Sequence, residues 1–199
     1  EINSGEDLKG LKMRIPGLGG DVMAKLGASP VSLPGGQIYE NLVSGAIDAT
    51  EWVGPWNDEA MKFYEAAKYY YYPGMHEPAS QLHVGFNASF WSKLSASDKA
   101  LIYSVAVGED SNFMAEYNAK NGAALERLVN DQGVVVKEFN DDVYAAFKRG
   151  SDEVYAEVGE HSALAKKIHE SAMNARKVVG DYVQLNDVAY VNKRNAALR

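Results

Sequence analysis

The sequence predicts an α/β fold in which a mainly parallel sheet is followed by a region rich in long helices. Between residues 8 and 88, short apolar runs alternate with short helical patterns, and glycines and prolines separate them. This alternation favours βαβ units. After Ser95 the apolar residues recur mainly three or four positions apart, which indicates helices. We therefore expect an α/β lobe at residues 1–88 and a helical region at residues 89–199.

The elements of the first region are short and end in turn residues. Strands are expected at residues 12–15, 30–33, 47–53, 69–72 and 82–87. Helices are expected at residues 20–26, 37–44 and 59–67. Gly27 and Gly45 follow the first two helices, where glycine commonly ends a helix.

The second region contains one isolated strand candidate, at residues 134–136. Ser95 and Asp98 have the spacing of an N-terminal helix cap, so we expect a long helix from there to about Asn130. A further cap at residues 140–142 begins a helical pattern that continues to the end of the chain. Breaks are expected in it near Gly159 and Gly180.

Composition excludes several classes of partner and site. The 199-residue chain is 46% hydrophobic and has a formal net charge of -7. No run of Lys or Arg stands out, so nucleic acid is not an expected partner. The chain has no cysteine, which rules out disulfides and thiolate metal ligands. No apolar run approaches the roughly 18 residues that span a bilayer, so we expect no membrane-spanning helix.

Arg14 is the first candidate site residue, because it ends the first predicted strand. A guanidinium in a buried strand needs an anionic partner, and its planar fork of donors matches a carboxylate. The side chain could therefore hold a small organic acid. Alternatively, it pairs with an internal Asp or Glu, or reaches solvent.

Glu51 and Trp52 end the third predicted strand, before a Gly-Pro turn. Ligands of open α/β sheets bind outside the carboxyl ends of strands, which is where Arg14 also lies. The Glu51 carboxylate could bind a hard cation through oxygen, with Trp52 as an apolar wall. Alternatively, Glu51 is the internal partner of Arg14. Gln81 could point into the same crevice or be an ordinary loop side chain.

Other motifs support no specific chemistry. The glycines at residues 17–20 and 35–36 match neither the dinucleotide fingerprint nor the P-loop. The four histidines lack zinc-enzyme spacing, and His76 and His83 are expected to be structural or solvated. No nucleophile elbow occurs. The run of tyrosines at residues 69–72 is expected to pack in a core or an interface, and a tyrosine that lines a ligand site is the alternative.

Three segments in order carry a resemblance to a known family. They are Lys12-Met13-Arg14-Ile15-Pro16-Gly17, then Pro34-Gly35-Gly36-Gln37-Ile38-Tyr39, then the run from Gly45 to Pro55 with the sequence GAIDATEWVGP. This ordered set resembles the DctP-like extracytoplasmic solute receptors of TRAP (tripartite ATP-independent periplasmic) transporters. The resemblance covers essentially the whole chain.

The resemblance implies a periplasmic-binding-protein-like lobe and a carboxylate ligand. Arg14 would bind the substrate carboxylate, and the Glu51 carboxylate and Trp52 carbonyl would bind a metal ion. Gln81 would lie near both substrate and metal, and Trp52 would also contact the substrate. The implied ligand is a 2-oxo acid such as pyruvate with Na⁺, or lactate with Ca²⁺. A C4-dicarboxylate is a further alternative within the family.

The same resemblance implies location and partners. We expect a periplasmic, non-enzymatic receptor, exported with a signal peptide that this sequence does not include, which delivers its ligand to the TRAP membrane permease. A homodimer through the C-terminal helices is also implied. An enzyme acting on a keto acid, with Glu51 as general base, is the alternative outside the family.

Family receptors are considerably longer and have two lobes. The chain begins just before the Arg14 strand, so we expect most of the N-terminal lobe to be missing. The 199-residue chain would then carry one side of the pocket and bind its ligand weakly or not at all. Exposed apolar surface could also alter its oligomeric state.

Overall fold

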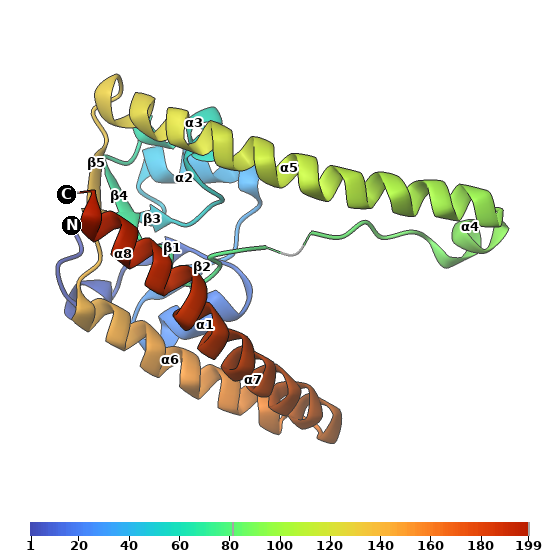
Figure 1. Ribbon diagram of the computed structural model, residues 1–199. Helices are drawn as coiled ribbons and strands as arrows, with labels where there is room; N and C mark the ends of the chain where they lie inside the picture. The colour runs from blue at the N-terminus through green and yellow to red at the C-terminus, as the bar shows by residue number, and fades with distance from the viewer. Residues whose placement is uncertain (81, 199) are drawn as a thin grey trace. The chain divides into compact units, whose positions relative to one another are not determined.

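The computed structural model describes residues 1–80 and 82–198 (Figure 1). They form two compact units, of which the first is Glu1–Phe147 and the second begins at Lys148. The strands of the first unit are β1 Lys12–Arg14, β2 Ser29–Val31, β3 Ala49–Thr50, β4 Tyr69–Tyr72 and β5 Val135–Glu138. Its α-helices are α1 Gly17–Lys25, α2 Ile38–Ser44, α3 Pro55–Ala60, α4 Ala88–Lys93, α5 Ala96–Asn130 and the first part of α6 Asp141–Glu160. Its short 3₁₀ turns are η1 Gly5–Leu8, η2 Gly35–Gln37 and η3 Phe63–Glu65.

All strand pairs in the described part of the chain are parallel, which confirms the predicted kind of sheet. One sheet has the order β2-β1-β3, and β1 is central, with Met13 opposite both Pro30 and Ala49. The second sheet pairs β4 with β5, so that Tyr70 lies opposite Val136. The strand predicted at 134–136 is therefore found at Val135–Glu138, where it is paired and not isolated.

Helix ends follow local chemistry. Gly45 ends α2 in the left-handed conformation, with a φ of 72°, which favours glycine because it has no Cβ. Ser95 and Asp98 form a reciprocal capping box at the start of α5, as predicted. The helix α1 begins at Gly17, three residues earlier than predicted, directly after Pro16.

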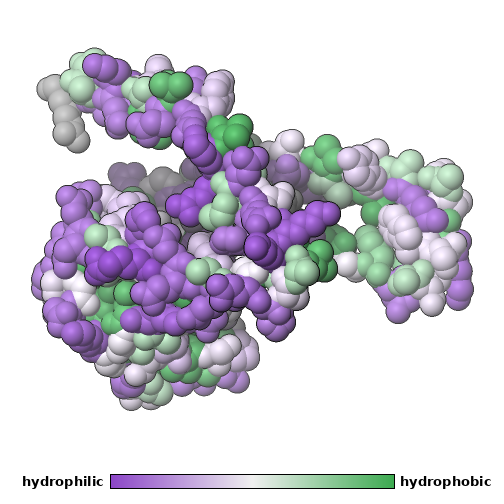
Figure 2. Space-filling view, turned by 90° about the horizontal axis from the view of Figure 1, so that it is seen from below, coloured by the Kyte–Doolittle hydropathy of each residue, from purple (hydrophilic) through white to green (hydrophobic). Residues whose placement is uncertain are grey.

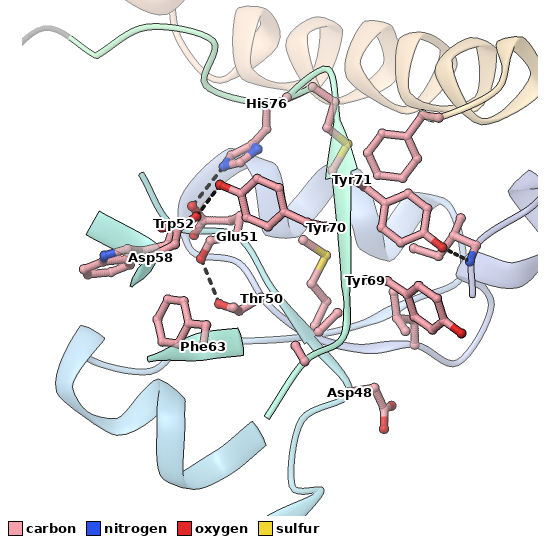
Figure 3. Close-up of a pocket in the computed structure, with 18 of the residues that line it drawn as sticks. Asp48, Thr50, Glu51, Trp52, Asp58, Phe63, Tyr69, Tyr70, Tyr71 and His76 are labelled. Carbon is pink, nitrogen blue, oxygen red and sulfur yellow. Dashed lines mark hydrogen bonds and ion pairs between the residues drawn. The ribbon is translucent and has the colours of Figure 1, made fainter. Parts of the chain in front are cut away.

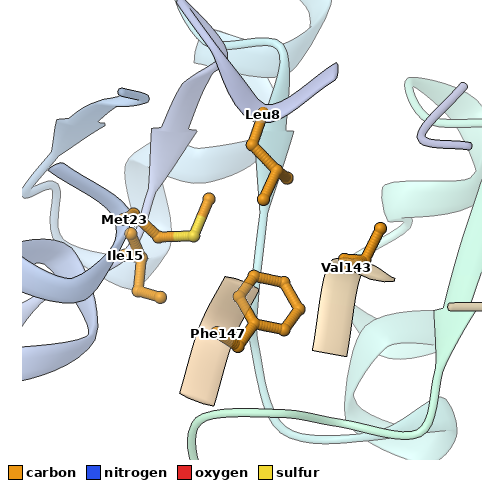
Figure 4. Close-up of a cluster of buried hydrophobic side chains, with 5 residues drawn as sticks. All are labelled: Leu8, Ile15, Met23, Val143 and Phe147. Atoms are coloured by element: carbon orange, nitrogen blue, oxygen red, sulfur yellow. The ribbon is translucent and has the colours of Figure 1, made fainter. Parts of the chain in front are cut away.

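Two buried clusters hold the first unit together. The first joins β1, α1 and the start of α6 (Figure 4), through Leu8, Ile15, Met23, Val143 and Phe147. The second lies around α2 and η3, through Ile38, Leu42, Ile47 and Phe63. The two helices α1 and α2 lie on opposite sides of the β2-β1-β3 strands (Figure 1). The carboxyl end of β1 thus lies between two packed layers.

Two predicted elements of the first unit differ in extent from the structure, and a third is wrong. The strand at 47–53 contracts to β3, because Val53 and Gly54 donate to the Asp58 carboxylate instead of to a strand. The predicted helix at 59–67 is divided into α3 and η3, where Lys62 adopts a left-handed φ of 58°. Residues 82–87 form no strand, and their apolar side chains are exposed.

The second unit is helical, as predicted for the end of the chain. It contains the rest of α6, α7 Ala163–Val183, a π-helical turn Gln184–Val188 and α8 Ala189–Ala197. The helix α6 ends next to Gly159, and Ser162 caps α7 through the backbone N–H of Ala165. The break predicted near Gly180 is wrong, because α7 continues through that residue and changes only at the π-helical turn.

The boundary between compact units does not coincide with the predicted division at residue 88. The helix α5 packs on α3, and β5 pairs with β4, so residues 89–147 belong to the same unit as the sheet. The assignment of residues 1–88 as a ligand-binding lobe stays a prediction. In the described residues, no helix has the length and apolar character that crossing a bilayer requires.

Apolar side chains gather on the surface at the α4 end of α5 (Figure 2). Between residues 82 and 114, which include the loop before α4, α4 and the first half of α5, the exposed large hydrophobic residues are Leu82, Val84, Phe86, Phe90, Leu101, Tyr103, Val105, Val107, Phe113 and Met114. The expected exposed apolar surface is therefore present on the first unit.

Candidate functional site

Arg14 occupies the carboxyl end of β1 and is only 8% exposed. Its Nε donates to the carbonyl oxygen of Leu33, at 3.1 Å, and this bond fixes the plane of the guanidinium. Its Nη1 forms an ion pair with Oε1 of Glu51. In this structure Arg14 is therefore paired with an internal glutamate, which is one of the alternatives that the sequence left open.

Glu51 directly follows β3 and lies beside Arg14 because β1 and β3 are paired in register. The backbone N–H of Glu51 donates to the carbonyl oxygen of Arg14, at 3.3 Å. The second carboxylate oxygen, Oε2, lies 3.1 Å from Nε2 of His76. Glu51 thus has a guanidinium at one oxygen and an imidazole at the other.

Trp52 forms one wall of this cluster. The guanidinium carbon of Arg14 lies 5.3 Å from the centre of the Trp52 ring, within the range of a cation–π interaction. Phe63 packs edge-on against the same ring, with 6.4 Å between ring centres. On another side the ring touches the backbone at Gly35, where a Cβ would overlap the indole. The indole position is fixed by packing, as the sequence suggested for an apolar wall.

Asp58 and Tyr70 complete the site; sequence reasoning missed Asp58 and gave a site role for a tyrosine of the run 69–72 only as the alternative. Asp58 is 8% exposed, and its Oδ1 accepts from the backbone N–H groups of Val53 and Gly54. Its Oδ2 accepts from the Tyr70 hydroxyl, at 2.6 Å. Burial raises the pKa of the Asp58 carboxyl above its ordinary value, since the ionised form is costly out of water. Burial and then the nearby Asp58 charge raise the pKa of Tyr70.

A cavity of about 530 Å³ adjoins these residues. It lies between the segment that carries Glu51 and Trp52 and the edge strand β4, and His76 also lines it. Figure 3 shows Tyr70 and His76 pointing toward the part of the cavity that holds Glu51 and Asp58. Arg14 is not among the lining residues and contacts the site through Glu51 and Trp52.

The structure brings together three of the four residues expected from the sequence, namely Arg14, Glu51 and Trp52. Gln81 lies outside the described residues. Oxygen donors suit Na⁺ and Ca²⁺, so the Glu51 carboxylate and the Trp52 carbonyl fit the chemistry of a hard cation. In residues 1–80 and 82–198, no group of three or more His, Asp or Glu side chains could hold a metal by itself. A cation here would need backbone or ligand oxygens as well.

Comparison with known proteins identifies relatives over most of the chain. The family model described as bacterial extracellular solute-binding protein, family 7 (DctP), matches residues 1–162. A protein of Nostoc sp. named monocarboxylate 2-oxoacid-binding periplasmic protein is 39% identical over 192 residues. That match covers 96% of this chain and 52% of the relative, so the chain spans about half the length of this curated relative.

Solved structures show the same similarity. A TRAP transporter solute-binding protein of Bordetella bronchiseptica, described as a dimer with calcium and picolinate in one site, has a TM-score of 0.90 and 32% identity. One from Pseudoalteromonas atlantica with bound sodium and pyruvate has a TM-score of 0.86, and one from Colwellia psychrerythraea with bound calcium and pyruvate has 0.88; both are 36% identical. The three matches cover 96–100% of this chain and 58–59% of those chains.

Proposed function

Because the chain belongs to family 7 of the bacterial extracellular solute-binding proteins, we propose that it binds a small carboxylate for a TRAP transporter. The ligand is a 2-oxo acid such as pyruvate, bound with Na⁺ or Ca²⁺. The names of the Nostoc relative and of the two pyruvate-bound structures support this ligand class. The protein acts in the periplasm and delivers the acid to the membrane permease.

The observation that carries the proposal is the buried Arg14 guanidinium paired with Glu51 at the ends of two parallel strands. Arg14 binds the carboxylate of the acid in place of Oε1 of Glu51, because its planar fork fits either group. Glu51 is then free to bind the cation, together with the carbonyl oxygen of Trp52. The cation supplies positive charge beside the second oxygen of the acid, and Gln81 adds a further polar contact to acid and cation.

Binding without catalysis fits this set of residues. No bond of the acid is made or broken. A homodimer through the C-terminal helices is part of the proposal, and light scattering of the purified chain tests it. Proton NMR of pyruvate during a long incubation separates receptor from enzyme, since a receptor leaves the acid unchanged.

Titration of pyruvate into the ¹⁵N-labelled chain tests the site, because NMR detects even millimolar binding. We expect the Arg14 Nε–H and Trp52 indole N–H signals to shift, and the response to strengthen when Na⁺ or Ca²⁺ is added. Acetamide, which has no charge, should cause no shift.

The variant Arg14→Ala should lose the response, because the acid loses its cationic partner. Arg127→Ala is the matched control. Arg127 also pairs with a glutamate, Glu59, but on the surface of α5 and α3. An undiminished response in Arg14→Ala contradicts the proposal.

A further inference from the structure

The His76 imidazole contacts the site, yet the carboxylate receptor described above assigns it no part. Its Nε2 lies 3.1 Å from Oε2 of Glu51, and the two side chains are 20% and 11% exposed. The Nε2 atom is buried and makes no hydrogen bond in this structure. A buried ring nitrogen without a hydrogen bond is costly, so its position beside a carboxylate needs an explanation.

The segment that leads into His76 is anchored at two points. The Tyr144 hydroxyl at the start of α6 contacts the carbonyl oxygens of Pro73 and Gly74, at 2.9 and 3.1 Å. Met75 packs against the first buried cluster. These contacts hold the residue before His76 in place and direct the imidazole toward Glu51 (Figure 3).

A carboxylate ligand changes the partners of Glu51. In this structure Arg14 uses Nε for the Leu33 carbonyl oxygen and Nη1 for Oε1 of Glu51. A ligand that takes the guanidinium therefore competes with Glu51 directly. Glu51 would then be a buried carboxylate that has lost its strongest donor, and such a charge is expensive unless another group binds it.

We propose that His76 is a positioning residue that holds Glu51 through Oε2 when Arg14 turns to the carboxylate of the ligand. At 3.1 Å the two atoms are already within hydrogen-bond distance, so the imidazole N–H can donate to Oε2 once the Glu51 carboxylate reorients. Glu51 then keeps the orientation that places its other oxygen toward the cation. This role rests on the proposed function, because it requires a carboxylate at Arg14.

Mutation of the outer partners of metal ligands typically costs about 10–100-fold in metal affinity or activity. In the pyruvate titration with Na⁺ present, His76→Phe should therefore weaken binding about tenfold or more, since the ring fills the space but donates no hydrogen bond. His76→Gln keeps an N–H donor and should stay within about threefold of the unsubstituted chain. The control is His83→Phe, an exposed histidine in the nearby loop, which should leave affinity unchanged.

A ligand-dependent signal gives a second readout that packing alone would not change. The ¹⁵N shift of His76 Nε2 should move to that of a hydrogen-bonded nitrogen when pyruvate is added. If His76→Phe does not fold, His76→Leu replaces it in the affinity measurement. The Nε2 shift of the unsubstituted chain also tests the role of His76 without any variant.

The outcomes separate the two proposals. Weaker binding in His76→Phe, recovery in His76→Gln and a shifted Nε2 signal support the role of His76. Equal affinities across all variants, equal weakening in Phe and Gln, or an unmoved Nε2 signal overturn it while the receptor function stands. An undiminished pyruvate response in Arg14→Ala overturns both, because the role of His76 requires a carboxylate at Arg14.

Discussion

The Tyr70 hydroxyl donates a 2.6 Å hydrogen bond to Oδ2 of Asp58 and thereby ties β4 to the segment that carries Glu51 and Trp52. The other oxygen of Asp58 accepts from the backbone of Val53 and Gly54, so one carboxylate fixes the turn after β3. The position of the loop that carries Glu51 and Trp52 therefore depends on β4, a strand that does not pair with β3.

Tyr70→Phe should lower the free energy of unfolding by about 1–3 kcal/mol, because it leaves an oxygen of the buried Asp58 without its donor. Equilibrium urea denaturation measures the loss. Tyr72→Phe on the same strand is the control, since the exposed Tyr72 hydroxyl contacts Glu138 at 3.3 Å. That change should cost less than about 0.5 kcal/mol. Equal losses in the two variants would contradict a special role for the Asp58 contact.

Asp58 should also make the folded protein less stable as pH rises, which is the opposite of what a carboxyl with a lowered pKa does. Its pKa in the folded protein lies above the ordinary value of 3.8, so the folded state keeps this proton to higher pH than the unfolded chain. The contribution of Asp58 to stability is therefore complete below the ordinary value and is lost as pH rises through the folded pKa. In Asp58→Asn this loss disappears.

Urea denaturation of both proteins from about pH 4 to about pH 7 gives the comparison. The stability difference, unsubstituted minus Asp58→Asn, should fall as pH rises. Carboxyls with lowered pKa, such as Glu59 beside Arg127, act in the opposite direction but are present in both proteins and cancel. A difference that grows with pH would show that Asp58 is stabilised as a charge.

Gly35→Ala should displace the Trp52 indole, because the added Cβ would overlap the ring. Overpacking of this kind costs about 1–3 kcal/mol. The indole would also move relative to Arg14, so we expect altered tryptophan fluorescence and weaker pyruvate binding. Gly36→Ala is the control, since its Cβ would meet nothing within 4 Å. If Gly35→Ala behaves like Gly36→Ala, the indole is not held by this contact.

Local patterns in the sequence predict much of the fold. The alternation of short elements predicts the parallel β2-β1-β3 sheet, and the spacing of Ser95 and Asp98 predicts the start of α5. The pairing of β4 with β5 is not predictable in this way, because the two strands lie more than 60 residues apart. Residues 82–87 have strand composition but no strand to pair with, and composition alone does not decide pairing.

Arg14 and Glu51 are predictable from the sequence, whereas His76 is not. Arg14 and Glu51 are charged residues at strand ends, a pattern that indicates function before any contact is known. His76 lies in a loop without any ligand spacing, and only the folded chain brings it to Glu51. Asp58 had a usable signal, since an acidic residue in the first turn after Gly54-Pro55 commonly binds the N-terminal backbone of a helix.

The Arg14–Glu51 pair should behave as a buried ion pair. Arg14→Met leaves Glu51 with His76 as its remaining partner, so we expect a loss near the lower end of the roughly 3–5 kcal/mol that follows from breaking such a pair. Adding Glu51→Gln to Arg14→Met removes the uncompensated charge and should restore part of that loss.

Guanidinium chloride denaturation of Arg14→Met, of Glu51→Gln and of the double variant measures the coupling between the two side chains. Arg127→Met supplies the comparison, because Arg127 pairs with Glu59 at the surface and should cost only about 0–1 kcal/mol. If Arg14→Met costs no more than Arg127→Met, the Arg14–Glu51 pair is solvated in solution. If instead the double variant is less stable than Arg14→Met, Glu51 contributes through contacts other than its pairing with Arg14.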